Sequence, residues 1–290
     1  MQFKAEQFEA VLAQTLQRTQ GADCPSQLEQ ALYAAVFPGG KRIRPRLALA
    51  VAEACRADDA ELVLAGAASI ELLHCASLVH DDLPCFDNAS TRRGKPSIHA
   101  AFGERIAVLT GDALIVLAFE SLAVAASRYP KRMAGVLGAI AKSVGAPSGI
   151  AAGQAWECEP SIDLEAYHRA KTGALFAGAS AVGAIAAGAQ PEGWHRFGEH
   201  LGRAFQAADD VCDAAGDAEI LGKPVGRDAA LARPSAVAER GLSGAVARVE
   251  TLLSEALDMV PECPGRDSFR KLVQRDAQRM LPAGLARVAA

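Results

Sequence analysis

Three aspartates, Asp81, Asp82 and Asp87, lie within one stretch of seven residues at the end of an apolar run, residues 70–79. Carboxylates packed this closely repel one another, which raises their pKa values or destabilises the fold unless a partner neutralises them. A divalent cation does so, and oxygen ligands that leave room for water suit Mg²⁺. Pro84 cannot continue a helical hydrogen-bond ladder, so we expect the chain to bend there and bring Asp87 back towards Asp81. The alternative for this cluster alone is a solvated acidic turn.

A second acidic cluster, Asp209, Asp210 and Asp213, follows another apolar run, residues 197–208. Asp209 and Asp213 stand at positions i and i+4 and therefore share one face of a helix. An acidic surface seldom repeats itself in such similar apolar surroundings. Two helices that each end in aspartates at metal-ligand spacing indicate a multi-metal site shared between facing helices of a bundle.

Basic segments lie on both sides of the first aspartates. Two glycines at 39–40 precede the segment 41–46, Lys-Arg-Ile-Arg-Pro-Arg. Glycines that allow close backbone approach, followed by cations at a helix start, are typical of a phosphate site, although an ordinary basic surface turn has the same composition. A second basic turn occupies residues 92–95, and His74 lies two helical turns before Asp81 on the same face. A lone histidine on an apolar helix is usually a core residue, but this alignment favours metal ions and cations converging on one polyanion.

The composition argues against several other classes of protein. The net charge of −4 argues against nucleic-acid binding. The seven cysteines are scattered and form no C-x-x-C pair, which argues against a disulfide framework or a structural zinc site and fits a reducing cytoplasm. The N-terminus lacks the apolar core of a signal peptide. The uncharged run 173–189 is mostly Gly and Ala, so we expect no membrane span.

Helical periodicity dominates the whole chain. Half of the 290 residues are apolar but only 5% are aromatic, which favours close-packed helices over sheets. We predict that Ser26 opens a helix through a capping box and that Asp163 caps the helix that carries Lys171 and Thr172. Without strand alternation, repeats or linkers, the economical interpretation is one all-α domain over residues 1–290, a large helical bundle.

Taken in chain order, several segments resemble the motifs of the trans-isoprenyl diphosphate synthases, over about residues 1–280. These segments are GGKRIRP (39–45), HCASLVHDDLPCFD (74–87), RRGKP (92–96), GQ (153–154), KTGA (171–174), FQAADDVCD (205–213) and GK (222–223). More narrowly, FPGGKRIRP, HCASLVHDDLP, GQAWE, AYHRAKTGALF and RPSAV resemble the geranylgeranyl diphosphate synthases of bacterial carotenoid and bacteriochlorophyll pathways.

The resemblance implies an all-α isoprenoid synthase fold around a central apolar cavity, usually as a homodimer in the cytoplasm. It implies a Mg²⁺-dependent prenyltransferase that condenses isopentenyl diphosphate with dimethylallyl, geranyl or farnesyl diphosphate. The expected main product is geranylgeranyl diphosphate, which would feed carotenoid and bacteriochlorophyll synthesis.

The resemblance also assigns roles to individual residues. It assigns two or three Mg²⁺ ions, which Mn²⁺ could replace, to Asp81, Asp82, Asp87, Asp209 and Asp213. It places the allylic diphosphate on these ions with help from Arg92, Lys171 and Lys223. It places isopentenyl diphosphate on Lys41, Arg44, His74 and Arg93, and gives Thr172 and Gln206 the role of oxygen dipoles that face the carbocation.

The chain departs from the family pattern at a few positions. Many relatives have acidic residues at Ala89 and Ser90, and an aspartate is common at Glu157. A farnesyl or other short-chain diphosphate synthase is the first alternative. A class I terpene cyclase would not need a second, basic diphosphate site. A non-catalytic subunit of a heteromeric synthase should have lost aspartates or cations that this chain keeps.

Product length is expected to depend on Ala76 and Ser77. Ser77 lies one helical turn before Asp81 on the same face, and Ala76 flanks it. In the family the growing chain passes these positions, and synthases of the farnesyl type often have an aromatic side chain at one of them. Both side chains are small here, so the resemblance implies room for a longer chain, with a floor that lies deeper.

The two acidic clusters predict an enzyme that depends on Mg²⁺ or Mn²⁺. Activity should vanish in excess chelator and return with the metal. Asp81→Ala or Asp209→Ala should lower turnover by orders of magnitude while circular dichroism shows a folded protein, because these charges serve a site and not the core. Full activity in excess chelator would refute the metal site.

Overall fold

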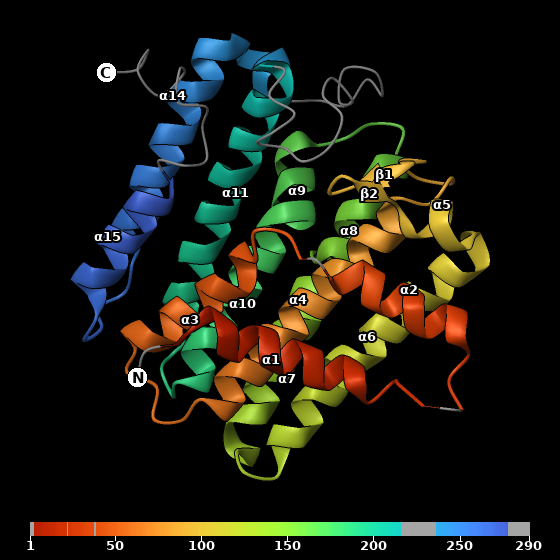
Figure 1. Cartoon of the computed structure of the whole chain (residues 1–290). Helices are drawn as coiled ribbons and strands as arrows, with labels where there is room; N and C mark the ends of the chain where they lie inside the picture. The colour runs from red at the N-terminus through yellow and green to blue at the C-terminus, as the bar shows by residue number, and fades with distance from the viewer. Residues whose placement is uncertain (1–2, 22, 38, 216–235, 278–290) are drawn as a thin grey trace. The chain divides into compact units, whose positions relative to one another are not determined.

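The computed structural model describes residues 3–21, 23–37, 39–215 and 236–277. Over these residues the chain is helical apart from one short hairpin and the connecting loops (Figure 1), which confirms the predicted all-α class. The chain divides into two compact units, the first made of Met1–Ile140 with Val182–Ala189 and the second of Ala141–Ala181 with Gln190–Ala290. The single domain expected over residues 1–290 stays a prediction.

Unit 1 is built around α4 (Glu61–Asp81), the helix that ends in the first aspartates. Fifteen of its 21 residues are buried, because a helix that is apolar on every side must lie at the centre of a bundle. Helices α1, α2, α3 and α6 pack against it. The other elements of the unit and their bounds are α1 (Ala5–Gln17), α2 (Ser26–Val36), α3 (Ile43–Ala54), β1 (Thr91–Arg92), β2 (Lys95–Pro96), α5 (Ile98–Phe102), α6 (Glu104–Ala126) and most of α7 (Pro130–Val144).

Small residues allow the helices of unit 1 to approach closely. The end of α10 (Ala174–Ala186) belongs to this unit, and a Cβ at its Gly183 would overlap the carbonyl oxygen of Ala48 on α3. A Cβ at Gly66 of α4 would lie 2.5 Å from Val182. The abundance of Ala and Gly in the sequence therefore serves close backbone contact, as the composition predicts.

Unit 2 is organised by α11 (Glu192–Ala215), which packs along α14 (Ala236–Asp258) through a core that includes Val211, Val249 and Leu252. An edge-to-face cluster of Trp194, Phe197 and Phe269 joins α11 to α15, with ring centroids 5.1 to 5.9 Å apart. The other elements are α8 (Ile150–Ala155), the 3₁₀ turn η1 (Trp156–Cys158), α9 (Leu164–His168), the π-helical turn η2 (Arg169–Gly173), the first part of α10, and α15 (Arg266–Ala277).

Of the two predicted helix caps, one is confirmed and one is wrong. The Asp163 carboxylate accepts the N–H groups of Glu165 and Ala166 at 3.0 and 3.1 Å and so caps α9. Ser26 makes no side-chain cap, because α2 begins at Ser26 itself and Pro25 occupies the N-cap position. The preceding proline thus shifts the helix start by one residue, away from the position where a serine hydroxyl can cap.

The second basic turn forms a hairpin. Strands β1 and β2 pair Thr91 with Pro96 and Arg92 with Lys95. Arg93 and Gly94 at its tip have φ angles of +54° and +74°, and two successive positive values are typical of the type I′ turn that matches strand twist. Strands of two residues are too short to produce an alternating pattern, so the sequence predicts the turn but not the strands.

Among the described residues, two helices are long and apolar enough to cross a membrane by length and composition alone. They are α4 and α6, whose most apolar windows have mean hydropathies of 1.8 and 1.9. The α4 window is 78% buried, as expected for a core helix, whereas the α6 window is 44% buried. The expected absence of a membrane span stays a prediction, and the run from residue 173 contains the shorter helix α10.

The contact at Gly183 predicts a stability difference between two glycine-to-alanine changes. Gly183→Ala should lower the free energy of unfolding by roughly 1–3 kcal/mol, because the new methyl group meets backbone that cannot move aside. Gly138→Ala on α7 is the control. Its Cβ meets open space, so better helix propensity should raise the free energy of unfolding by roughly 0.5–1 kcal/mol. Urea denaturation measures both, and equal effects of the two changes would contradict the packing.

Candidate active site

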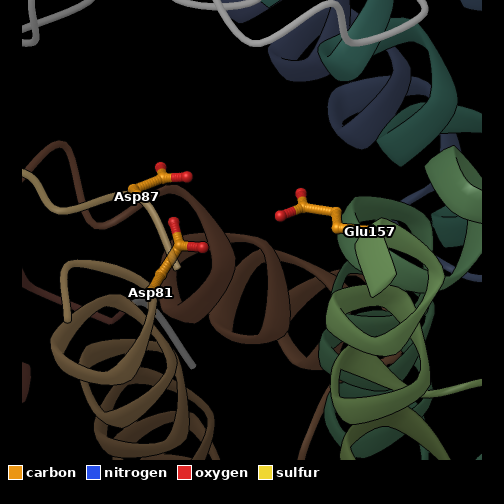
Figure 2. A group of neighbouring side chains, drawn as sticks. All are labelled: Asp81, Asp87 and Glu157. Atoms are coloured by element: carbon orange, nitrogen blue, oxygen red, sulfur yellow. The ribbon is translucent and has the colours of Figure 1, made fainter. Parts of the chain in front are cut away.

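The chain folds back directly after α4, as Pro84 predicts. The Asp87 N–H donates to the Asp81 carbonyl at 3.0 Å, and the Ala89 N–H donates to the Asp82 carbonyl at 3.1 Å. Carboxylate oxygens of Asp81 and Asp87 lie within 4.8 Å of one another, and Figure 2 shows both side chains at this end of the helix. Both are half-buried. A pair of partly exposed carboxylates fits Mg²⁺, which binds through oxygen and keeps several waters.

Unlike Asp81 and Asp87, Asp82 is buried, with 2% of its surface exposed, and it is bound to Arg92. The Arg92 Nε donates to both carboxylate oxygens at 3.0 and 3.2 Å, and its Nη2 donates to one of them and lies 3.7 Å from Asp81. Burial raises the pKa of Asp82, and the Arg92 guanidinium opposes this shift. The pair therefore fixes one positive charge beside the acidic cluster, where it can meet an anionic ligand.

Arg44, His74 and Arg93 come together beside α4. The Arg44 Nη1 donates to His74 Nε2 at 3.2 Å. Burial and the charges of Arg44 and Arg93 hold the pKa of His74 well below its usual range, so the ring is neutral and its proton is on Nδ1. The Arg93 guanidinium lies over Gly40, where a Cβ would be 2.8 Å from Nε. Lys41 is exposed in the same turn.

We call the set Lys41, Arg44, His74 and Arg93 the isopentenyl cradle, after the substrate that the family resemblance predicts for these residues. It offers three permanent cations and one neutral imidazole N–H in a single unit. This donor set suits a phosphate group that carries no metal of its own. All four residues, which the family resemblance assigned to isopentenyl diphosphate, lie in unit 1.

The second aspartate cluster lies near the end of α11. Asp209 is half-buried, whereas Asp210 and Asp213 are buried. Gln206, one turn earlier, donates its Nε2 to Asp210 at 2.9 Å, and its Oε1 accepts the Thr172 hydroxyl at 2.6 Å. These two bonds fix the orientation of the Gln206 amide and connect η2 to the acidic face of α11.

Lys171 is held by Glu157, a residue to which the sequence assigned no role. The Lys171 Nζ donates to Glu157 Oε1, which also accepts the Tyr167 hydroxyl at 2.6 Å. Gln154 donates to the other oxygen at 3.1 Å, and the Lys171 ammonium lies 5.7 Å from the Tyr167 ring centroid. Glu157 lies in η1, directly after α8 (Figure 2). Helical spacing places Gln154 near Glu157 and Tyr167 near Lys171, and this is the signal that could have found them.

Lys171 and Thr172 lie in the π-helical turn η2 and not in the regular α-helix that the sequence predicts. Single π turns inside helices are frequent at functional sites. Two glycines make room for this one: a Cβ at Gly153 of α8 would overlap the backbone of Lys171, and one at Gly202 of α11 would lie 2.7 Å from the Cα of Gly173. Helices α8 and α11 therefore contact the backbone of η2 directly, which fixes the directions of its side chains.

The structure gathers the predicted site residues into two groups. Unit 1 holds Asp81, Asp82 and Asp87 with Arg92, and the isopentenyl cradle; unit 2 holds Lys171, Thr172, Gln206, Asp209 and Asp213. Of the two residues assigned to product length, Ala76 is buried, whereas Ser77 is partly exposed and donates its hydroxyl to the His74 carbonyl at 2.8 Å. Lys223 lies outside the described residues. That the two acidic clusters share ions stays a prediction.

Fold and site together define an all-α protein with two aspartate clusters at helix ends, each accompanied by cations suited to diphosphate groups. The family model described as Polyprenyl synthetase matches residues 25–269. The chain belongs to this family.

Individual relatives match nearly the whole chain. Geranylgeranyl diphosphate synthase of Cereibacter sphaeroides is 52% identical over 281 residues, which are 97% of this chain and 98% of the relative. Geranylgeranyl diphosphate synthase of Rhodobacter capsulatus is 46% identical over 276 residues, which are 95% of this chain and 96% of the relative. A crystal structure of a geranyltransferase from Helicobacter pylori, complexed with magnesium and isoprenyl diphosphate, is similar with a TM-score of 0.78 and 29% identity, covering 95% of this chain and 99% of that one.

The contact between Gly153 and η2 predicts a kinetic effect. Gly153→Ala should displace the backbone of Lys171 and raise the KM for the allylic diphosphate by about tenfold, as expected when one hydrogen bond to a charged group is lost. Steady-state kinetics with each substrate varied in turn measures this. Ala151→Ser, at an exposed position of the same helix, is the control and should leave both KM values unchanged. Unaltered kinetics in Gly153→Ala would show that the π turn does not position Lys171.

Proposed function

We propose that the protein condenses isopentenyl diphosphate with dimethylallyl, geranyl or farnesyl diphosphate in a Mg²⁺-dependent reaction whose main product is geranylgeranyl diphosphate. The observation that carries the proposal is the presence of two kinds of charged group that suit diphosphates, carboxylates that can hold metal ions and a cradle of cations. The likeness of the whole chain to two bacterial geranylgeranyl diphosphate synthases supports the product.

In this proposal the allylic diphosphate binds at the aspartates. Bound Mg²⁺ supplies positive charge that neutralises the leaving diphosphate. Asp81 and Asp87 from the first cluster and Asp209 and Asp213 from the second would hold the ions, which Mn²⁺ could replace. Arg92 would donate to the same diphosphate from its position on Asp82, and Lys171 from its position on Glu157. The family resemblance adds Lys223 to these cations.

Isopentenyl diphosphate would bind in the isopentenyl cradle. Arg44 and Arg93 offer forked N–H donors that match phosphate oxygens, and Lys41 adds a mobile ammonium. His74 stays neutral because its pKa is lowered, so it can donate only from Nδ1 while Nε2 accepts from Arg44. Because no carboxylate is assigned to this cradle, the second diphosphate needs no metal.

The reaction makes one carbon–carbon bond. The allylic C–O bond breaks, and its electron pair leaves with the diphosphate that the cations stabilise. The double bond of isopentenyl diphosphate attacks the allylic cation, and loss of a proton from the adjacent carbon restores a double bond. The departed diphosphate would take that proton. The products are an allylic diphosphate longer by one isoprene unit and free diphosphate, provided that apolar walls exclude water from the cation.

Thr172 and Gln206 would face the cation with oxygen and not with hydrogen. The Thr172 hydroxyl donates its hydrogen bond to Gln206 Oε1, and the Gln206 Nε2 donates to Asp210. The free lone pairs of the Thr172 oxygen are then available to the positive charge. The hydrogen-bond chain thus sets the polarity of this part of the site.

Two other classes of function fit the site less well. A class I terpene cyclase ionises one diphosphate and would leave the isopentenyl cradle without a ligand. A non-catalytic subunit would not need the aspartates or cations, all of which the sequence keeps. A farnesyl diphosphate synthase remains the alternative within the family, and it differs only in where chain growth stops.

We also propose that the protein is a cytoplasmic homodimer that meets a second copy through α6. This helix exposes Val108, Leu109, Val116, Phe119 and Val124 on one side of unit 1. These are five of the ten large apolar side chains that are exposed among the described residues, and an exposed apolar face of this kind is typical of an interaction surface. Sedimentation equilibrium tests the proposal, since a monomeric mass at micromolar concentration would contradict it.

The function is tested by incubating the purified protein with isopentenyl diphosphate and each allylic diphosphate, and by chromatography of the products. Geranylgeranyl diphosphate should form from every allylic partner. Products formed without isopentenyl diphosphate would indicate a cyclase. No product with any partner would indicate a non-catalytic subunit.

Side-chain size at Ser77 should control product length. Ser77→Phe should shorten the product to farnesyl or geranyl diphosphate, because it removes space that would bury an isoprene unit at roughly 0.8 kcal/mol for each methylene. Ser77→Ala keeps the space and should keep the product. Ala76→Phe should act in the same direction, but Ala76 is buried, so overpacking would accompany the effect. An unchanged product in Ser77→Phe, by chromatography after phosphatase treatment, would show that length is set elsewhere.

A further inference from the structure

Arg42 is the one arginine of the GGKRIRP segment that is buried, with 8% of its surface exposed. Its Nε and Nη2 donate to the two oxygens of Glu9 on α1 at 2.9 and 3.2 Å. Its Nη1 donates to Glu71 on α4 at 2.6 Å, and Nη2 also donates to the carbonyl of Val36 at the end of α2 at 2.9 Å. One guanidinium at the start of α3 therefore bonds to three other helices.

The backbone conformation of Arg42 and the small size of Gly39 support the contacts of the guanidinium. Arg42 has a left-handed backbone conformation, with φ of +49°, which residues other than glycine rarely adopt. The Arg42 guanidinium packs against the backbone of Gly39, where a Cβ would overlap it. The first glycine of the segment thus makes room for Arg42, just as the second, Gly40, makes room for Arg93.

Two neighbouring contacts set the register between α3 and α4. Arg42 meets Glu71 at 2.6 Å, and Arg44, two residues later, meets His74 at 3.2 Å. Glu71 and His74 are three residues apart and lie on one face of α4. A displacement of the α3 start that broke the first contact would therefore move Arg44 away from His74. The position of Arg44 in the cradle depends on Arg42.

The fold by itself does not require a charge here. Glu71 is 1% exposed, so removing Arg42 alone would leave a buried carboxylate without its counter-charge. Replacing both members of such a pair by apolar residues is often neutral for stability. Burial alone would lower the pKa of Arg42, but hydrogen bonds to Glu9 and the charge of Glu71 outweigh it and keep the guanidinium charged. The Arg42–Glu71 pair is thus better explained by its role in orienting the start of α3 than by a contribution to folding stability.

We propose that Arg42 is a positioning residue of the isopentenyl cradle, which holds the turn between α2 and α3 so that Lys41 and Arg44 face the diphosphate. This inference rests on the proposed function and adds a residue to it. Arg42 itself does not touch the substrate, because its donors are used on Glu9, Glu71 and the Val36 carbonyl.

Two variants and one matched control test the proposal. Arg42→Lys keeps the charge but cannot make the four bonds at once. The double variant Arg42→Met with Glu71→Met removes the pair without leaving a buried charge, so it stays folded if the single variant does not. Arg132→Lys is the control. Arg132 also donates to both oxygens of one carboxylate, that of Asp58, and to a backbone carbonyl, that of Ala186, away from the cradle.

The readouts are the KM for each substrate, kcat, the melting temperature, and the ¹⁵N shift of His74 Nε2. Both Arg42 variants should raise the KM for isopentenyl diphosphate about tenfold and leave the allylic KM within about twofold. The His74 Nε2 signal should move in both, because the Arg44 contact is loosened. Arg132→Lys should lower the melting temperature and change neither KM nor the His74 signal.

The proposal is overturned if the Arg42 variants raise both KM values equally, or if they lower only the melting temperature as the control does. A wild-type protein that forms no prenyl product would refute the proposed function instead. The His74 signal then still decides the inference about Arg42, since a signal unchanged by both variants would show that Arg42 does not position Arg44.

Discussion

Charge buried along one apolar helix is the constraint on which unit 1 depends. Helix α4 is enclosed on most sides, yet it carries Glu71 and His74, and the buried Asp82 follows directly at its C-terminal end. Buried polar groups must find fixed partners because water cannot solvate them. Each of the three meets an arginine from one of the two basic segments, residues 41–46 or 92–95. Arg42 and Arg92 neutralise the two buried carboxylates, whereas Arg44 donates a hydrogen bond to the neutral ring of His74, and these three contacts hold the basic segments against unit 1.

Unit 2 meets the same requirement by a different arrangement. Its cation, Lys171, is neutralised by Glu157, and its acidic helix is connected to η2 by the neutral groups of Gln206 and Thr172. A π turn supplies the geometry, because it widens the helix at Lys171 and Thr172, which the proposed function places at the allylic diphosphate and the cation. In both units a cation of the proposed site is thus held by a carboxylate, Arg92 by Asp82 and Lys171 by Glu157.

Glycine has a specific use in both arrangements. Residues such as Gly39 and Gly153 are unfavourable for regular structure, since glycine loses the most conformational freedom on folding. Here each allows a charged group or a backbone to come closer than any side chain would permit. Glycines in these segments therefore indicate close approach and not only a bend.

The sequence by itself determined the structural features that depend on a few consecutive residues. Helical period, the i and i+4 spacing of Asp209 and Asp213, and the bend at Pro84 are properties of a few consecutive residues, and all of them are found in the structure. The grouping of Lys41, Arg44, His74 and Arg93 came from family motifs and not from local pattern. The sequence could not distinguish an α turn from a π turn at Lys171, because the two differ by one step in hydrogen bonding.

Only the tertiary structure decided the contacts that cross long stretches of chain. Contact with Gly153 and Gly202 selects the π turn, and these glycines lie on two other helices. Glu157 lies 14 residues before Lys171, and Arg42 meets its carboxylates across 29 and 33 residues. Helical periodicity does not predict contacts between residues so far apart in the sequence. The sequence therefore does not distinguish a buried arginine from an exposed one. Which cation binds substrate and which one holds the others in place is therefore a property of the packed helices.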